Sequence, residues 1–321
     1  MTQTQEATAR LWLRKWHILV STGADTDENG EETALDVSNL HCTFEIHKAR
    51  GKQGSYATCR IYNLNAKTEN RLINEGDRLI IEAGYESGQY GKIFDGQIVW
   101  PSRSRENGTD YILTLMAIDG DHVLNGCFIS KTVNRGLNQR KVIETVANDA
   151  EEKTPVAKIS DNLSTQELPR GKVFFGSAYQ YLKDACRGNA ASFYIEDGQL
   201  NVTKLIDVAD DEAIVLSPET GLVGSPEQIM YGVSFKCLLN PNIKLGTLVQ
   251  LKGVEVNEIQ ASPGDNVTPI DDDWIYQAYE VVHTGDTRGE TWYTQVQGIS
   301  RYGKGAIPSI LANAAQNGNG V

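Results

Sequence analysis

Apolar and polar residues alternate in short segments over the first third of the chain, from about Trp12 to Ile118. Such alternation predicts β-strands, because successive side chains of a strand point to opposite faces. Turn-forming residues separate the segments, and Asn107-Gly108 is the strongest hairpin signal among them. This pattern is typical of an antiparallel barrel or sandwich. The expected strands are residues 40–46, 56–64, 78–83, 93–99 and 111–117.

The period changes between about Asp119 and Val208. Apolar residues at Val142, Ile143 and Val146 fall on one face of a helix over residues 138–150. A second helix is expected at 177–187, followed by a β-hairpin around Asp197-Gly198. The middle of the chain therefore reads as a small α/β insert.

Strands return after Ile214, and their order resembles that of the first block. We expect them at residues 230–238, 247–251, 275–283 and 291–298. Each block has a strand, a connector ending in glycine, a second strand, a long strand, a polar hairpin containing arginine, and a closing strand. We interpret this as two β-units of one kind, although any two antiparallel meanders share part of the pattern.

These patterns predict a mainly β fold with an α/β insert. The expected domains are residues 1–118 for a first β-barrel, 119–210 for the insert, 211–302 for a second β-barrel and 303–321 for a flexible C-terminal arm. Three chains with two equivalent units each would present six units in a ring. Such a ring could match a six-fold partner on one face and a three-fold partner on the other.

Composition narrows the function classes. The hydrophobic content of 40% suffices for a substantial core, and no run approaches the roughly 20 apolar residues of a membrane helix, so we expect a soluble protein without membrane insertion. The net charge of −12 disfavours binding to phosphate backbones, but it suits a surface past which DNA slides. No signal-peptide pattern is found, and five cysteines at unrelated spacings suggest reduced, buried thiols.

One local motif could bind a metal. Asp25, Asp27 and Asn29 alternate before Gly30, and Asp36 stands at the twelfth position, as in a calcium-binding loop. No helices are expected on either side, however, so a solvated acidic hairpin loop is the preferred interpretation. We expect no cofactor.

Two polar clusters could support acid–base chemistry. His283, Asp286, Arg288 and Glu290 crowd one hairpin, and we interpret them as turn formers and surface ion pairs. The cluster Asp119, Asp121 and His122 follows a strand and reads as a turn or helix cap.

The other motifs suggest no catalysis. The stretch from Leu11 to Trp16 is a strand whose tryptophans face a core or another subunit, or alternatively an edge that touches nucleic acid or membrane. Gly221 to Pro226 lacks the lysine of a phosphate loop. We expect no catalytic residue.

Several segments resemble phage baseplate hub proteins. The most specific are Leu216 to Pro226 and Leu238 to Gly246, which are similar to the opening of the second barrel of that family. Tyr279 to Gly289 with Trp292 looks like its closing hairpin. Ile61 to Leu64 with Phe94-Asp95-Gly96 is similar to its first barrel.

The resemblance implies two tube-type antiparallel β-barrels and a structural role, not an enzyme. The family, related to the late control protein D and to type VI spike bases, forms trimeric, pseudo-six-fold hubs of contractile tails. The implied partners are two further copies, the hexameric tail tube, the trimeric cell-puncturing spike and other baseplate proteins, with DNA passing through the channel without specific binding. The implied location is the virion, after assembly in the host cytoplasm. The alternatives are a tail-associated cell-wall-degrading enzyme and a glycan-binding β module.

Overall fold

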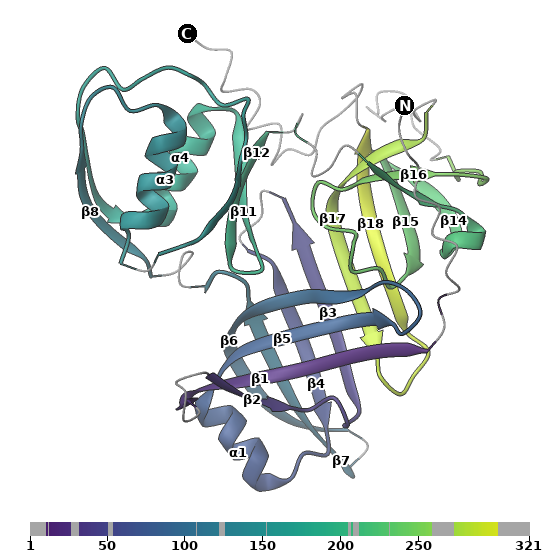
Figure 1. Cartoon of the computed structure of the whole chain (residues 1–321). Helices are drawn as coiled ribbons and strands as arrows, with labels where there is room; N and C mark the ends of the chain where they lie inside the picture. The colour runs from purple at the N-terminus through teal and green to yellow at the C-terminus, as the bar shows by residue number, and fades with distance from the viewer. Residues whose placement is uncertain are drawn as a thin grey trace. The chain divides into compact units, whose positions relative to one another are not determined.

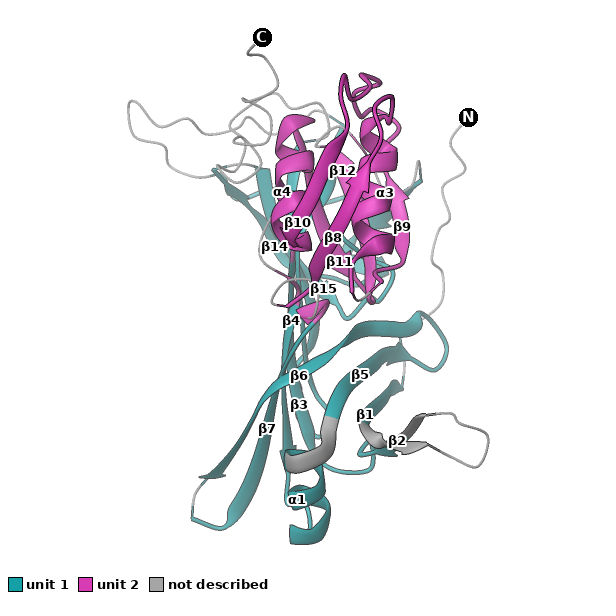
Figure 2. Cartoon of the chain, turned by 90° about the vertical axis from the view of Figure 1, so that its left-hand side faces the viewer, with its two compact units in different colours: residues 1–48, 56–118, 209–306 teal, residues 49–55, 119–208, 307–321 magenta. Residues whose placement is uncertain are grey.

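The computed structural model divides the chain into two compact units. Unit 1 comprises residues 1–48, 56–118 and 209–306, and unit 2 comprises residues 49–55, 119–208 and 307–321 (Figure 2). The residues described are 11, 13–26, 32–50, 54–106, 108–121, 126–151, 153–204, 207, 212–230, 232–258 and 273–300, with the backbone alone for 22–26, 32–33 and 74–76.

Unit 1 is built mainly from strands (Figure 1). Its first block contains β1 (Arg14–Thr26), β2 (Glu32–Asp36), β3 (Cys42–Ala49), β4 (Tyr56–Tyr62), α1 (Ala66–Glu75), β5 (Gly76–Tyr85), β6 (Tyr90–Glu106) and β7 (Asp110–Ile118). Its second block contains β13 (Ala213–Leu216), the 3-10 helix η1 (Pro218–Thr220), β14 (Leu222–Ile229), β15 (Gly232–Leu238), β16 (Leu248–Leu251), β17 (Ile275–Asp286) and β18 (Trp292–Ser300).

The two blocks repeat one order of strand pairing. In the first block β3 pairs with β4, β4 with β7, β7 with β6, β6 with β5 and β5 with β1. In the second block β14 pairs with β15, β15 with β18, β18 with β17, β17 with β16 and β16 with β13. Five pairings thus recur in the same chain order, and only the last differs in direction, because β13 is parallel to β16 whereas β1 is antiparallel to β5.

Both blocks belong to one sheet of thirteen strands. The path runs β14-β15-β18-β17-β3-β4-β7-β6-β5-β1-β2, and β16 and β13 branch from β17. Along the described strands this path is open at β14 and at β2. The mainly β prediction with a large, mostly antiparallel sheet is therefore confirmed, whereas two closed barrels are not seen there.

The blocks meet where β17 lies beside β3. The backbone N–H of Thr287 donates to the carbonyl oxygen of Cys42 at 3.0 Å, and the N–H of Cys42 donates to the Thr287 hydroxyl at 2.9 Å. Gly285 lies against the ring of Phe44, where any Cβ atom would clash. The Trp292 ring of β18 packs edge-on against Phe44, with the ring centroids 5.5 Å apart. The core of the first block is thus completed by the second.

A charged cluster joins β5 to β6. The Asp95 carboxylate, whose side chain is only 5% exposed, accepts two bonds from the Arg78 guanidinium at 2.6 and 2.9 Å and one from Lys92 Nζ at 2.8 Å. Burial raises the pKa of Asp95, but the two cations outweigh it and hold that pKa below its usual value.

The region between β4 and β5 differs from the prediction. The connector between the strands expected at 56–64 and 78–83 contains helix α1, which was not predicted, and β5 begins directly at Gly76. Asn65 starts this helix, because its Oδ1 accepts from the N–H of Thr68 at 2.9 Å. Among the described side chains of α1 the adjacent Leu72 and Ile73 pack on the core, so no helical period was visible in the sequence.

In its described residues unit 2 has the helices α3 and α4 between two small sheets (Figure 1). Its elements are β8 (Phe128–Val133), α3 (Gln139–Asp149), β9 (Val156–Ile159), β10 (Lys172–Ser177), α4 (Ala178–Gly188), β11 (Ala191–Glu196) and β12 (Gln199–Lys204). The predicted helices and hairpin are confirmed. Asn138 and Ser177 cap the helices, and positive φ angles of 56° at Asp197 and 75° at Gly198 form the predicted turn.

Candidate functional site: a polar sheet face

One face of the large sheet is polar across the junction of the two blocks. Strands β15, β18, β17, β3 and β4 are neighbours, and alternate residues of each lie in the core. The other residues form the surface that we call the polar sheet face: Thr58, Arg60 and Tyr62 on β4, Thr43, Glu45 and His47 on β3, Glu280, Val282 and Thr284 on β17, Tyr293, Gln295 and Gln297 on β18, and Lys236 on β15.

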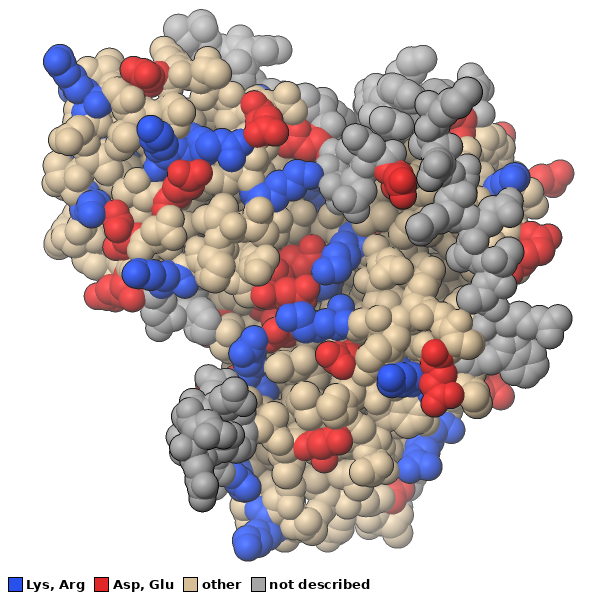
Figure 3. Space-filling model, in the orientation of Figure 1, with Lys and Arg blue, Asp and Glu red and all other residues tan. Residues whose placement is uncertain are grey.

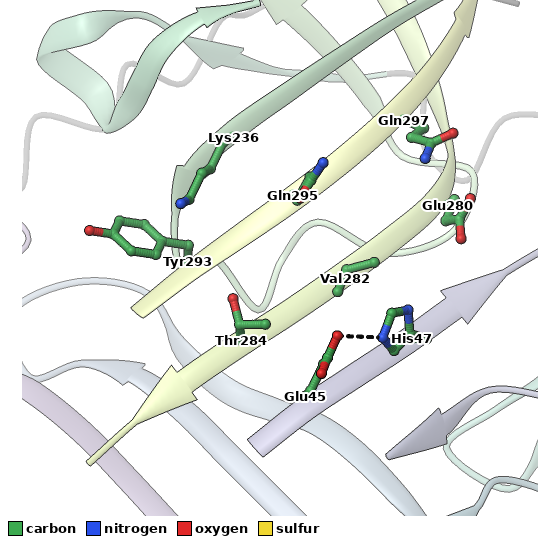
Figure 4. Close-up of a pocket in the computed structure, with 9 residues that line it drawn as sticks. All are labelled: Glu45, His47, Lys236, Glu280, Val282, Thr284, Tyr293, Gln295 and Gln297. Atoms are coloured by element: carbon green, nitrogen blue, oxygen red, sulfur yellow. Dashed lines mark hydrogen bonds and ion pairs between the residues drawn. The ribbon is translucent and has the colours of Figure 1, made fainter. Parts of the chain in front are cut away.

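A cavity of about 290 Å³ lies on this face where β3 meets β17 (Figure 4). His47 and Glu45 line it from β3, and His47 Nε2 lies 2.8 Å from Glu45 Oε1. On its far side Lys236 stands over the ring of Tyr293, at 3.9 Å from the centroid. Figure 4 also shows that β3 and β17 run in opposite directions.

A second hollow of about 220 Å³ continues toward β4. At its edge the His41 ring stacks on Tyr62 at a centroid distance of 4.3 Å, and His41 Nε2 lies 2.9 Å from Asp286 Oδ1. Partial burial raises the pKa of Asp286, but the N–H groups of Arg288 and Gly289 and the His41 ring together hold it below its usual value. The ionised Asp286 thereby fastens the tip of the β17–β18 hairpin to the first block.

The polar sheet face is poorly suited to catalysis by paired carboxylates. Glu45 and Glu280 line the same cavity, but the Glu45 side chain is 57% exposed. A general acid needs a carboxyl group that is withdrawn from water, and this face is open. On the side of the molecule drawn in Figure 3 basic and acidic side chains are interspersed, and the polar sheet face likewise carries Arg60 and Lys236 as well as Glu45 and Glu280. Threonine, glutamine and tyrosine side chains between these mixed charges make a hydrophilic surface on which neither sign of charge is concentrated.

The calcium-loop motif at residues 25–36, for which an acidic hairpin loop was the preferred interpretation, is only partly within the described residues. Asp25 has a described backbone in β1, whereas Asp27 and Asn29 lie outside the described residues. The Asp36 carboxylate accepts from the N–H of Ser38 at 2.8 Å and lies 3.3 Å from His17 Nε2. In the described part of the chain no cluster of three or more metal-ligating side chains occurs.

The hairpin cluster does not converge on one site. His283 is buried and pairs with the Thr294 hydroxyl at 2.9 Å, whereas Asp286 closes the turn. Arg288 donates to the carbonyl oxygen of Asn39 at 3.0 Å. The backbone oxygen of Glu290 accepts from Arg14 at 2.8 Å. The cluster therefore holds the two blocks together.

Asp119 clamps a turn within unit 2. Its carboxylate accepts from the backbone N–H groups of Asp197 at 2.7 Å and Gly198 at 2.9 Å. Asp121 is described nearby, and His122 lies outside the described residues. This contact resembles the cap that was expected, but its partner is a hairpin 78 residues away.

Other sequence features have structural roles. All five cysteines are free and buried, as expected, and burial raises the pKa of Cys42 to about 12. Trp16 packs edge-on against Trp292, with centroids 5.9 Å apart, as expected for a strand facing a core, while Trp12 lies outside the described residues. None of the described helices has the length and hydropathy required to cross a bilayer.

The polar sheet face was not predicted from the sequence. The signal was available in the alternation of Thr43, Glu45 and His47 on one strand and of Tyr293, Gln295 and Gln297 on another. What the sequence could not reveal is that these strands are neighbours, because β17 and β3 are far apart in the chain.

Comparison with known proteins identifies the family. A sequence profile described as "Baseplate hub gp41" matches residues 24–259. No curated protein sequence matches the chain.

Solved structures share the fold at very low identity. The 43 kDa tail protein of prophage MuSo2 from Shewanella oneidensis matches with a TM-score of 0.55 at 9% identity, over 91% of this chain and 98% of its own. The tail protein of Neisseria meningitidis MC58 gives 0.55 at 10% identity, over 91% and 98%. The E. coli c3393 protein, a type VI secretion component, gives 0.54 at 7% identity, over 85% and 77%.

Proposed function

Because the chain belongs to the baseplate hub gp41 family, we propose that three copies form a ring that adapts a hexameric tail tube to a trimeric spike. The resemblance to baseplate hub proteins is confirmed by the family match, and the related folds belong to phage tail and type VI components. The chain is thus a structural component of the phage tail. The ring, its symmetry and its partners are our proposal.

The repeated pairing order carries this proposal. Five strand pairings recur between the blocks, so each copy offers two similar β-units side by side. A ring of three copies then has six similar positions and three identical ones. This is what an adaptor between a six-fold and a three-fold partner requires. We propose that each block, near residues 1–118 and 211–302, is a tube-type unit whose barrel is completed by its neighbours, with residues 119–210 as the insert.

The polar sheet face fits the lumen of such a ring. It spans the junction of the two blocks, carries both signs of charge and displays neutral hydrogen-bonding groups. Together with the net charge of −12, this surface gives DNA little to bind. We propose that it lines the channel, that the ring contacts the tube protein on one rim and the spike and other baseplate proteins on the other, and that the copies fold in the host cytoplasm.

The mass of the purified protein tests the ring. We expect light scattering coupled to size exclusion to give three times the chain mass of 35.3 kDa, and electron microscopy of stained particles to show a central hole with six-fold-like features. A trimer without a hole would refute the adaptor geometry. A monomer that becomes a ring only with tube or spike protein would show that the ring is formed by co-assembly.

A cell-wall assay tests the structural role. Purified protein is incubated in a gel containing bacterial peptidoglycan, with lysozyme as a positive control, and we expect no clearing. If clearing occurs, Glu45→Gln and Glu280→Gln proteins will show whether the carboxylates of the Figure 4 cavity cause it. Loss of clearing in both variants would replace the structural role by catalysis.

A further inference from the structure

The sheet of β8 and β10 turns its charged side chains toward the helices of unit 2. Ile129 of β8 is buried in the core of this unit, and Lys131, two residues later, lies on the same side, where its Nζ is 3.0 Å from Asp149 Oδ2 of α3. On β10 the buried Phe174 faces this core, and Lys172 Nζ stands 5.1 Å from the centroid of its ring. In a strand with one face in water, polar residues ordinarily take the open face. This sheet reverses that arrangement.

The opposite face of the sheet, which we call the aromatic face, consists of Phe128, Ser130, Thr132, Val173 and Phe175 and carries no charged side chain. Phe175 is 70% exposed and Val173 is 64% exposed. The rings of Phe128 and Phe175 meet edge-on, with their centroids 5.1 Å apart. The strand register puts Ser130 opposite Phe175 and Thr132 opposite Val173. Adjoining exposed apolar side chains with only hydroxyl groups between them indicate a surface that another segment covers.

The edge of β10 is closed at the centre of this face. The backbone N–H of Phe175 donates to the Tyr181 hydroxyl at 3.1 Å, and that hydroxyl donates to the carbonyl oxygen of Phe175 at 3.1 Å. A strand added beside β10 would need these two backbone groups. A segment that lies across the aromatic face leaves the Tyr181 bonds in place, so we expect the partner there.

One segment of the chain matches the aromatic face in chemistry. Residues 305–321 contain no Asp, Glu, Lys, Arg or His, although 22% of the chain is charged. Within them the apolar residues have the spacing of one helical face: Ile307, Ile310, Leu311 and Ala314. Pro308 falls in the first turn of such a helix, where proline is tolerated. A helix this short is marginal in water, so it requires a surface that buries its apolar stripe.

We propose that residues 306–315 form a short helix that covers the aromatic face of the same chain. Residues 307–321 are grouped with unit 2, to which this face also belongs. The segment supplies apolar side chains without charge, and the face supplies aromatic rings and hydroxyl groups without charge. The inference is independent of the proposed ring, because it concerns a contact within one chain.

The path of the chain is consistent with this contact. Four residues form one row across the sheet of unit 1 through successive pairings: Ser300, Tyr276, Val249 and Ile214. At about 4.8 Å per strand, Ser300 lies about 14 Å from Ile214. Val208, where the central segment of unit 2 ends, is six positions before Ile214. The chain after Ser300 therefore leaves unit 1 near the point where it enters from unit 2.

The covalent connection favours the same chain over a second copy. A short flexible tether gives an effective concentration of about 1 mM, far above the micromolar concentrations at which copies meet. A contact with a dissociation constant of about 0.1 mM is then formed about ten to one within a chain, and rarely between copies. A free copy thereby keeps its aromatic face from associating with other proteins.

The accessibility of one introduced thiol tests the contact. Ser130→Cys places the thiol in the aromatic face, directly across from Phe175, and all five native cysteines are buried. The full-length protein is treated with N-ethylmaleimide at a low and a high protein concentration, and labelling is followed by intact mass. Three proteins are compared: Ser130→Cys alone, with Leu311→Asp, and with Ala312→Asp. The aspartate at 311 enters the apolar stripe, whereas the one at 312 lies on the other side of the helix.

We expect Leu311→Asp to raise the labelling rate of the Ser130→Cys thiol about tenfold, because it releases the segment from the face. The matched control Ala312→Asp adds the same charge at the next residue and should leave the rate within about twofold of that of Ser130→Cys alone. Met116→Cys supplies a second control, since Met116 is 43% exposed and lies on β7 of unit 1. Its labelling rate should be the same with and without Leu311→Asp.

The other outcomes overturn the inference. Equal labelling rates of Ser130→Cys in all three proteins would show that the segment does not cover the face. Protection that disappears on dilution would identify a second copy, or its arm, as the cover. Faster labelling of Met116→Cys, and not of Ser130→Cys, in the Leu311→Asp protein would place the segment on unit 1 instead. None of these results bears on the ring, whose test is the mass of the purified protein.

Discussion

Replacing His283 by asparagine should make unit 1 less sensitive to acid. The His283 ring is 1% exposed, and its Nδ1 lies 2.9 Å from the Thr294 hydroxyl. Burial lowers the pKa of His283 to about 3, with a further contribution from the charge of Lys48. The native protein therefore keeps this ring neutral at pH values at which an unfolded chain would protonate it.

The size of the effect follows from proton linkage. The unfolded histidine titrates near 6.5, so below that pH the unfolded state binds a proton that the native state refuses until about pH 3. The lowered pKa means that stability is complete above pH 6.5 and is lost as the pH falls. Between pH 7.5 and pH 5.0 the loss is RT ln(1 + 10^1.5), about 2 kcal/mol.

Urea unfolding followed by tryptophan fluorescence measures this loss. All five tryptophans belong to unit 1, so the signal reports on that unit. At pH 7.5 we expect the free energy of unfolding of His283→Asn to lie below wild type by about 1 kcal/mol, because asparagine fills less space and keeps only one polar contact. At pH 5.0 the difference between the two proteins should shift by about 2 kcal/mol in favour of the variant.

Comparing two proteins at two pH values cancels the titration of every other group. His47→Asn, which alters a histidine on the open face of β3, supplies the baseline for losing a histidine from this sheet. The reasoning is refuted if the gap between wild type and His283→Asn is the same at both pH values, because His283 would then take up its proton in the native state.

Three further substitutions test other parts of the fold. Asp95→Asn should lower the free energy of unfolding by about 2 kcal/mol in urea titrations at pH 7, since it leaves two partly exposed cations without their carboxylate; an effect below 0.5 kcal/mol would count against it. Asp119→Ala should cost about 1 to 2 kcal/mol and speed amide hydrogen exchange at the turn that it clamps, and unchanged exchange would contradict that role. Gly285→Ala should cost about 2 kcal/mol in a thermal melt because its Cβ meets the Phe44 ring. The control Gly188→Ala, in a helix with open space around it, should be neutral or slightly stabilising, and equal costs for both glycines would refute the packing argument.

Local patterns in the sequence predicted most of the elements. Alternation located β4, β7, β17 and β18 to within a few residues, because each has one buried and one open face. Helices α3 and α4 were found for the same reason, since each buries one stripe of apolar residues. Helix α1 was not predicted, because the described side chains of this helix that pack on the core, Leu72 and Ile73, are adjacent in sequence.

Local sequence patterns could not predict which strands pair when they are far apart in the chain. The junction between β17 and β3 depends on which two edges meet, and neither edge carries a local mark of its partner. The sequence showed where polar residues cluster, but not which role each residue has. In the hairpin cluster, for example, His283 is buried in the core whereas Asp286 closes a turn. The repeat was visible in the sequence as an order of segments. The structure adds that the ladder of β6 with β7 and the ladder of β17 with β18 each have a bulge at the second residue after a glutamine, Gln97 and Gln277 respectively.

The separation of Cys42 and Thr287 by 245 residues affects how the protein is made. During synthesis at about 5 to 20 residues per second, β3 leaves the ribosome roughly 10 to 50 s before the strand that will cover it. Throughout that interval the nascent chain displays an uncovered edge to every other nascent chain nearby. Slower translation lengthens the time for which this edge is uncovered, and a higher temperature makes association through it more frequent. We therefore expect the yield of soluble protein to depend on chaperones that bind the chain before translation ends.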